Sequence, residues 1–152
     1  MLWYRINLDK IATGQAVDEP IFIALSDVIK KFPIELDHLR ELISGMEDDL
    51  YCAKYQRFED LRRYCYRVAS TVGLCLVEIY GYNDPNARRH AVEMGIYLQM
   101  VNVLRDIQED LSRNRIYLPT EELTKFGITE EDLMSGKLSS SVGWQDFMRH
   151  YL

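Results

Sequence analysis

The residues best suited to chemistry are four polar side chains within one stretch: Gln99, Asn102, Asp106 and Asp110. On a continuous α-helix they would point into an arc of about 80°. Apolar residues border that arc at Met100, Val103, Leu104, Ile107 and Leu111. Two carboxylates one turn apart beside an apolar wall repel each other and lose hydration, a cost that a cation or basic groups would offset.

A divalent cation suits this pattern. Magnesium prefers oxygen ligands and often binds through one or two carboxylates together with substrate phosphates. The residues Asn102, Asp106 and Asp110 would therefore suit Mg²⁺, or Mn²⁺ in its place, shared with a phosphate group. The spacing alone favours the alternative, in which the same residues form a solvated acidic surface that pairs with Arg105 and Arg113.

A second notable stretch runs from Tyr64 to Gly73 and carries small residues at Ala69, Ser70 and Gly73. Small residues would let another helix or an extended ligand approach the backbone closely. Composition favours ordinary helix packing, and both interpretations stay open at this point. The sequence suggests no Ser/His/Asp triad. It also has no glycine-rich nucleotide loop, so we expect any phosphate to be held by metal and side chains.

Long helical periodicities separated by few glycines and prolines predict an all-α protein. Residues 1–18 carry little periodicity, and the stretch after Pro119 predicts only short elements. We see no repeat and no second domain, so 1–152 is expected to form a single helical domain. The expected helices are 20–31, 35–51, 57–80, 85–113, 121–126, 129–134 and one from Trp144, with a serine-rich loop at 139–141.

Composition limits the function classes. With 18 basic and 24 acidic residues, the net charge of −6 disfavours a nucleic-acid partner, and 47% apolar residues exclude disorder as the main state. No uncharged apolar run is long enough to span a bilayer, and no secretory leader is readable, so a cytoplasmic location is expected.

Cys52, Cys65 and Cys75 lack zinc-site spacing and are expected as free buried thiols. We assign His38, His90 and His150 no catalytic role.

Several ordered blocks resemble the squalene/phytoene synthase family. These blocks are residues 64–73, 98–110 and 114–119, with a further one at 42–46 followed by Asp49 and Leu50. The similarity extends roughly from Leu36 to Gly127. The resemblance implies an isoprenoid-synthase-type helical bundle whose central cavity holds two prenyl diphosphates.

The resemblance also implies a reaction, the head-to-head condensation of farnesyl or geranylgeranyl diphosphates with Mg²⁺-assisted loss of diphosphate. By this resemblance, Asp106 and Asp110 match the second aspartate-rich, metal-binding motif, and Arg105 lies beside the diphosphate. Tyr64 matches a tyrosine near the reacting carbons, and Asp49 an acidic residue near the cleft. The remaining matches are the polar lining residues Gln99 and Asn102, and the prenyl-channel residues Val68, Val72, Ala91, Met94 and Leu98. A peripheral membrane contact would serve product release.

The sequence also departs from the family pattern. The first aspartate-rich motif should precede Leu42, yet none of the 41 residues before it forms such a pair, and Ser70 stands where many members have glycine. We therefore expect a truncated portion of a longer prenyltransferase domain. The alternative is a non-catalytic helical module that keeps the fold and binds a prenyl lipid or a partner helix.

Overall fold

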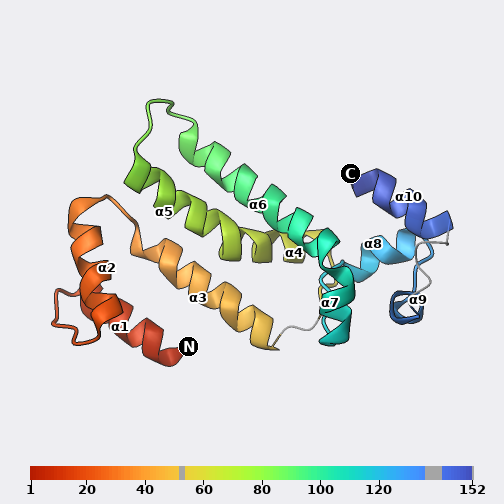
Figure 1. The fold of residues 1–152 in the computed structure, drawn as a ribbon, viewed down its shortest axis with the longest axis horizontal. Coiled ribbons are helices and arrows are strands. Elements are labelled where there is room, and N and C mark those ends of the chain that lie inside the picture. Colours follow the sequence, from red (N-terminus) through yellow and green to blue (C-terminus); the bar gives the residue numbers. More distant parts are fainter. Residues whose placement is uncertain (52–53, 136–141, 152) are drawn as a thin grey trace. The chain divides into compact units, whose positions relative to one another are not determined.

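The computed structural model describes residues 1–51, 54–135 and 142–151, and within these ranges it contains helices and no extended strand (Figure 1). This confirms the all-α prediction. The chain divides into two compact units. The first comprises Met1–Leu50 and Tyr64–Gln99, and the second comprises Tyr51–Arg63 and Met100–Leu152. The expectation of one single domain over 1–152 stays a prediction, and each unit is described by itself.

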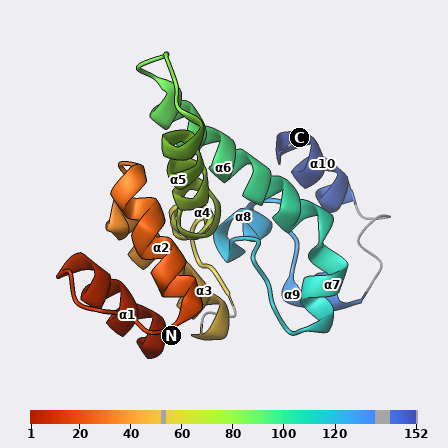
Figure 2. The same ribbon diagram turned by 60° about the vertical axis from the view of Figure 1, so that its left-hand side comes forward.

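The first unit opens with three helices, α1 (Leu2–Ala12), α2 (Pro20–Lys31) and α3 (Leu36–Tyr51), which lie next to one another in Figure 2. Pro20 occupies the first turn of α2, where its missing N–H costs no helical hydrogen bond. Leu8, Phe22 and Ile43, one from each helix, form the buried cluster that holds them together. The helices 20–31 and 35–51 are confirmed.

Helix α1 corrects the sequence analysis, which predicted no helix over residues 1–18. Its apolar residues do not form one stripe, because Leu2, Trp3, Tyr4 and Ile6 are exposed while Leu8 is buried. A period of 3.6 is therefore hard to read from the sequence.

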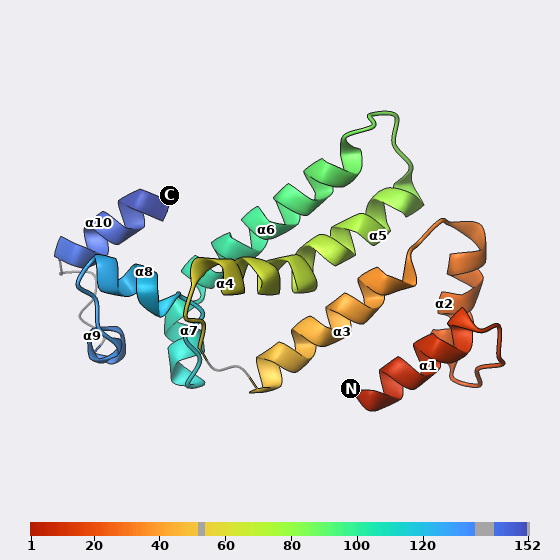
Figure 3. The ribbon, with the colours of Figure 1, turned by 180° about the vertical axis from the view of Figure 1, so that it is seen from behind.

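Helices α4 (Phe58–Cys65), α5 (Thr71–Tyr80) and α6 (Ala87–Arg105) complete the long elements. Between α4 and α5 lies a π-helical turn, η1 (Tyr66–Ser70), where the sequence predicted uninterrupted α-helix. Gly81, with φ of 74°, ends α5 in the left-handed region that glycine tolerates best. Figure 3 shows α5 and α6 as antiparallel neighbours with α3 alongside.

The second unit is built from shorter helices, α7 (Ile107–Ser112), α8 (Thr120–Lys125), α9 (Glu130–Met134) and α10 (Val142–Tyr151). Thr129 and Asp132 form a capping box at the start of α9. The Tyr55 carbonyl accepts from the Thr120 amide at 3.0 Å, and Lys54 forms an isolated bridge with Ile116. The buried apolar residues of this unit are Tyr55, Leu61, Val103, Ile116, Leu118, Leu123, Ile128, Leu133 and Phe147.

The prediction of one continuous helix over 85–113 is wrong at one residue. The helix is interrupted at Asp106, which has φ of −97° and ψ of 12° and separates α6 from α7. Hydrogen bonds from the Asp106 amide to the Asn102 carbonyl and from the Asp110 amide to the Asp106 carbonyl, each 2.9 Å, persist on either side. The common arc predicted for the four polar residues assumed one regular helix, and that assumption fails at Asp106.

Two further predictions concern cysteines and loops. Cys65 is buried and Cys75 is half-buried, and both are free thiols. Cys52 and the loop predicted at 139–141 lie outside the described residues. Among the helices that the structure describes, none is long and apolar enough to cross a membrane.

Candidate functional site

Asp106 and Asp110, in the second unit, have opposite electrostatic environments. The Asp106 carboxylate accepts hydrogen bonds from Nε and Nη2 of Arg105, both at 2.6 Å, and this pairing lowers its pKa. Asp110 is half-buried on α7. Burial raises its pKa, and the negative charge of Asp106 raises it further. One carboxylate therefore already has a cationic partner, while the other would gain from one.

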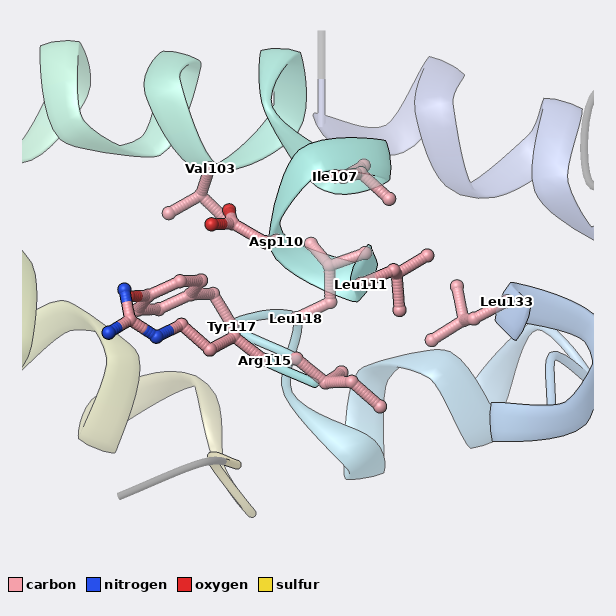
Figure 4. A pocket seen from close by; sticks show the side chains of 9 residues that line it. Val103, Ile107, Asp110, Leu111, Arg115, Tyr117, Leu118 and Leu133 are labelled. Carbon is pink, nitrogen blue, oxygen red and sulfur yellow. The ribbon is translucent and has the colours of Figure 1, made fainter. Parts of the chain in front are cut away.

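A small pocket surrounds Asp110 (Figure 4). Its volume is about 10 Å³, room for a single water-sized molecule. In Figure 4 the carboxylate of Asp110 and the side chains of Arg115 and Tyr117 extend toward the same side. The rest of the lining is apolar and consists of Val103, Ile107, Leu111, Ile116, Leu118 and Leu133.

Arg115 and Tyr117 are pocket residues that the sequence analysis did not identify. The Arg115 amide donates to the Asp110 carbonyl at 2.9 Å, and the charge of Arg115 opposes the rise in the pKa of Asp110. Asn114 precedes it with φ of 58°, a left-handed conformation that asparagine adopts more readily than most residues. The available signal was the family block 114–119, to which the sequence analysis had given no role.

The polar residues upstream of the bend are divided between the units. Asn102 and Arg105 belong to the second unit with Asp106 and Asp110, whereas Gln99 belongs to the first. Gln99 and Asn102 are half-buried on α6. Within residues 1–51, 54–135 and 142–151, no three His, Cys, Asp or Glu side chains gather closely enough to hold a metal ion. Two carboxylates and an amide oxygen suit Mg²⁺ only if phosphate supplies further ligands.

In the first unit, a side-chain hydrogen bond compensates for the offset backbone hydrogen bond of the π-helical turn η1. The Thr71 amide donates to the Tyr66 carbonyl, five residues back, which defines the π offset. The Arg67 carbonyl, four residues back, instead accepts from the Thr71 hydroxyl at 2.7 Å. Thr71 is buried, so its side chain supplies a donor to this carbonyl at a tightly packed place.

Small residues bring η1 and α5 close to α6. A Cβ on Gly95 would lie 2.5 Å from Cα of Ser70, and one on Gly73 would lie 3.3 Å from the Ala91 carbonyl oxygen. The buried Ser70 hydroxyl donates to the Val92 carbonyl at 2.7 Å. Helix packing thus accounts for Ser70 and Gly73, the simpler of the two interpretations that the sequence left open.

The residues matched to the reacting carbons and the prenyl channel all lie in the first unit. Tyr64 is buried, with 4% of its surface exposed, whereas Tyr66 is half-buried. Val68, Ala91 and Asp49 are half-buried. Val72, Met94 and Leu98 are exposed, and they belong to a larger set of exposed apolar residues on α5 and α6 that includes Leu76, Ile79 and Tyr97. Their roles stay predictions.

Comparison with known proteins identifies the relatives. The family model described as Squalene/phytoene synthase matches residues 1–152. The chain belongs to the squalene/phytoene synthase family. It is 40% identical to phytoene synthase 1 of Arabidopsis thaliana over 98% of this chain and 36% of that protein. It is 37% identical to the phytoene synthase of Arthrospira platensis over 94% of this chain and 50% of that protein.

Solved structures agree with the family assignment. The squalene synthase HpnC from Alicyclobacillus acidocaldarius matches with a TM-score of 0.88 and 29% identity, over 97% of this chain and 55% of that one. A dehydrosqualene synthase in complex with ligand matches with a TM-score of 0.81 and 28% identity, over 95% of this chain and 52% of that one. The predicted isoprenoid-synthase-type fold is confirmed. The chain spans about half the length, or less, of the relatives it matches.

Proposed function

We propose that this chain contributes to the head-to-head condensation of two prenyl diphosphates, with farnesyl or geranylgeranyl diphosphate as substrate. The observation that carries the proposal is membership of the squalene/phytoene synthase family over residues 1–152, and the Asp110 carboxylate, which lines an apolar pocket together with Arg115, supports it. An ionised carboxylate in such a place is stabilised by a cation. Family membership does not favour the alternative of a non-catalytic module.

The acidic residues are proposed to hold Mg²⁺, or Mn²⁺, together with diphosphate. Asp106, Asp110 and the Asn102 side-chain oxygen supply the hard oxygen donors that such an ion prefers. When bound, the ion neutralises the charge of the departing diphosphate. Arg105 and Arg115 add positive charge for the phosphate oxygens, and binding of a cation at Asp106 would compete with the Arg105 ion pair.

The apolar residues of the first unit are proposed to contact the prenyl chain and to exclude water. Val68, Val72 and Ala91 lie on η1, α5 and α6, followed on α6 by Met94 and Leu98. An allylic cation survives only where water is kept away, so an apolar wall is part of the chemistry. Within this proposal Gln99 and Asp49 line the site, Tyr64 lies near the reacting carbons, and products leave through a peripheral membrane contact.

Thermal melts with Mg²⁺ and farnesyl thiodiphosphate, an analogue that resists ionisation, test the proposal. A ligand that binds only the folded state adds about 2.7 kcal/mol of stability at a hundredfold excess over Kd. We expect Asp106→Asn to lose most of the resulting rise in melting temperature. Glu109→Gln is the matched control, because Glu109 is exposed, lies three residues further along on α7 and pairs with Arg113 instead.

The outcomes separate clearly. A rise that needs both Mg²⁺ and the analogue, and that Glu109→Gln keeps, supports the proposal. An equal rise in the Asp106→Asn variant would show that the ligand binds elsewhere. No rise in the unmodified chain contradicts the proposed function itself.

A further inference from the structure

Arg67 forms two ion pairs that connect the π-helical turn to α3. Its Nε donates to Glu41 at 2.9 Å, and its Nη1 donates to Asp48 at 2.8 Å. The arginine side chain is only 24% exposed, so the pair with Asp48 is partly shielded from solvent. Both acceptors lie on α3 and Arg67 lies on η1, so the fork of one guanidinium holds the turn to that helix at two points.

Gly45 provides a second, independent contact between the same two elements. A Cβ on Gly45 would lie 2.7 Å from Cγ1 of Val68 and 2.8 Å from Cβ of Arg67. Real carbon atoms do not approach so closely, so only glycine lets α3 lie this near to the turn. Both features therefore act at the contact between α3 and η1. The ion pairs of Arg67 attract the two elements, and the absence of a side chain at Gly45 allows their close approach.

The π-helical hydrogen bond in η1 affects the directions of the side chains that lie at the contact between η1 and α3. An extra residue in the helical turn changes the direction of every side chain that follows, and the turn here begins two residues after Tyr64 and includes Val68. Val68 therefore lies within the offset turn, and its Cγ1 is next to Gly45 of α3. The contacts between η1 and α3 add to the constraint that the helical backbone places on this side chain.

We infer that Arg67 is a positioning residue that determines prenyl-chain length, because it holds η1 against α3 and so fixes the place of Val68. This inference rests on the proposed function, in which Val68 contacts the prenyl chain. Arg67 itself is not required to touch the substrate. A release of the turn should therefore alter the preference between farnesyl and geranylgeranyl chains more than it alters recognition of the diphosphate.

Arg5 offers a matched control within the same unit. It also holds α3 through a bidentate contact, donating to Glu47 at 2.5 Å and 3.3 Å and to the Ser44 hydroxyl at 3.0 Å. Its side chain is 33% exposed, close to the value for Arg67. Arg5, however, lies on α1 and has no contact with the π-helical turn among these bonds. Arg5→Gln should remove a similar ion pair without moving Val68.

The experiment measures dissociation constants for farnesyl and geranylgeranyl thiodiphosphate, with Mg²⁺ present, by isothermal titration calorimetry on the full chain. We expect Arg67→Gln to weaken the preferred ligand relative to the other by about tenfold, a size that methylene-scale changes in an apolar wall produce. Asp48→Asn should shift the ratio in the same direction by less, and Arg67→Lys should restore part of it. Gly45→Ala displaces Val68 directly and should favour the shorter chain.

Each outcome decides a different point. A changed ratio in Arg67→Gln and Asp48→Asn, with an unchanged ratio in Arg5→Gln, supports the inference. Equal losses of melting temperature in Arg67→Gln and Arg5→Gln with an unchanged ratio would make Arg67 a structural ion pair only. An unmodified chain that binds both ligands equally overturns the inference while the proposed function stands. An unmodified chain that binds neither ligand overturns both.

Discussion

Two interruptions of predicted helices behave differently. At η1, in the first unit, the displaced Arg67 carbonyl is satisfied by the Thr71 hydroxyl, and Ser70 and Thr71 are both at most 1% exposed. At Asp106, in the second unit, the bend is half-exposed, and its carboxylate pairs with the exposed side chain of its neighbour Arg105. One irregularity is buried and tightly packed, whereas the other is polar and open to solvent.

The difference indicates what each irregularity is suited to do. A buried turn with satisfied hydrogen bonds and no spare volume resists displacement, which suits a part that positions other residues. A half-exposed bend whose own carboxylate pairs with an arginine can exchange that arginine for another cation at little cost, because exposed ion pairs contribute little stability. The first region should therefore respond to volume and hydrogen bonding, and the second to charge, pH and ions.

The largest expected effect follows from adding volume at the π-helical turn. Gly95→Ala would place a methyl group 2.5 Å from Cα and 2.6 Å from the amide nitrogen of Ser70, and neither backbone atom can rotate away. We expect the free energy of unfolding to fall by about 3 kcal/mol. Urea denaturation followed by circular dichroism would measure it.

Gly73→Ala is the control for that substitution. Its Cβ would lie 3.3 Å from the Ala91 carbonyl oxygen and otherwise make ordinary contacts. The gain in helix propensity, about 0.5 to 1 kcal/mol, should roughly offset the crowding. Similar losses in both variants would show that the turn is no more tightly packed than the rest of the α5–α6 interface.

A smaller effect is expected from removing the compensating hydrogen bond. Thr71→Val keeps the shape of the buried side chain but leaves the partly buried Arg67 carbonyl without its hydroxyl donor. The cost of such a group is about 1 to 3 kcal/mol. Denaturation of the variant beside the parent chain measures the difference.

Thr124→Val is the matched control, because the Thr124 hydroxyl donates to the Thr120 carbonyl at 2.8 Å at an exposed position of the regular helix α8. Water can replace that donor, so the change should stay within about 0.5 kcal/mol. If the two valine variants lost equal stability, the hydroxyl of Thr71 would have no special role in the π-helical turn.

The sequence predicted the helices better than it predicted their interruptions. Periodicity located α2 and α3 because Phe22 and Ile43 face one shared core. It could not reveal η1, because one offset hydrogen bond leaves the hydrophobic pattern almost unchanged. It missed α1, whose exposed Trp3 and Tyr4 obscure the stripe, and it joined α6 to α7 because Asp106 has no proline or glycine beside it to mark a bend.

The candidate site was predictable to a similar extent. Spacing pointed to Asp106 and Asp110 as candidates, a prediction that stands, but it treated them as equivalent, whereas in the structure their pKa values shift in opposite directions. That distinction depends on burial and on the rotamer of Arg105, neither of which a sequence encodes at short range. Arg115 and Tyr117 were missed because a loop, not a helical period, brings them to Asp110.

The smallest expected effect concerns the pH dependence of the bend. Because the pKa of Asp110 is raised in the folded protein, ionised Asp110 costs stability at neutral pH. As the pH falls through that raised pKa, the folded state takes up a proton before the unfolded state does, and the cost disappears. Asp110→Asn should therefore be more stable than the parent at neutral pH, by up to about 0.5 kcal/mol.

The stability difference between Asp110→Asn and the parent should vanish only well below the ordinary aspartate pKa of about 3.9, where the parent carboxyl is protonated in both states. Asp106→Asn should behave in the opposite sense, since its lowered pKa stabilises the parent only above that range. Urea unfolding at several pH values, without divalent ions, measures both curves. If the two variants had the same sign at neutral pH, the carboxylates would share one environment. Asp110 would then have no unmet electrostatic need that a metal ion could satisfy.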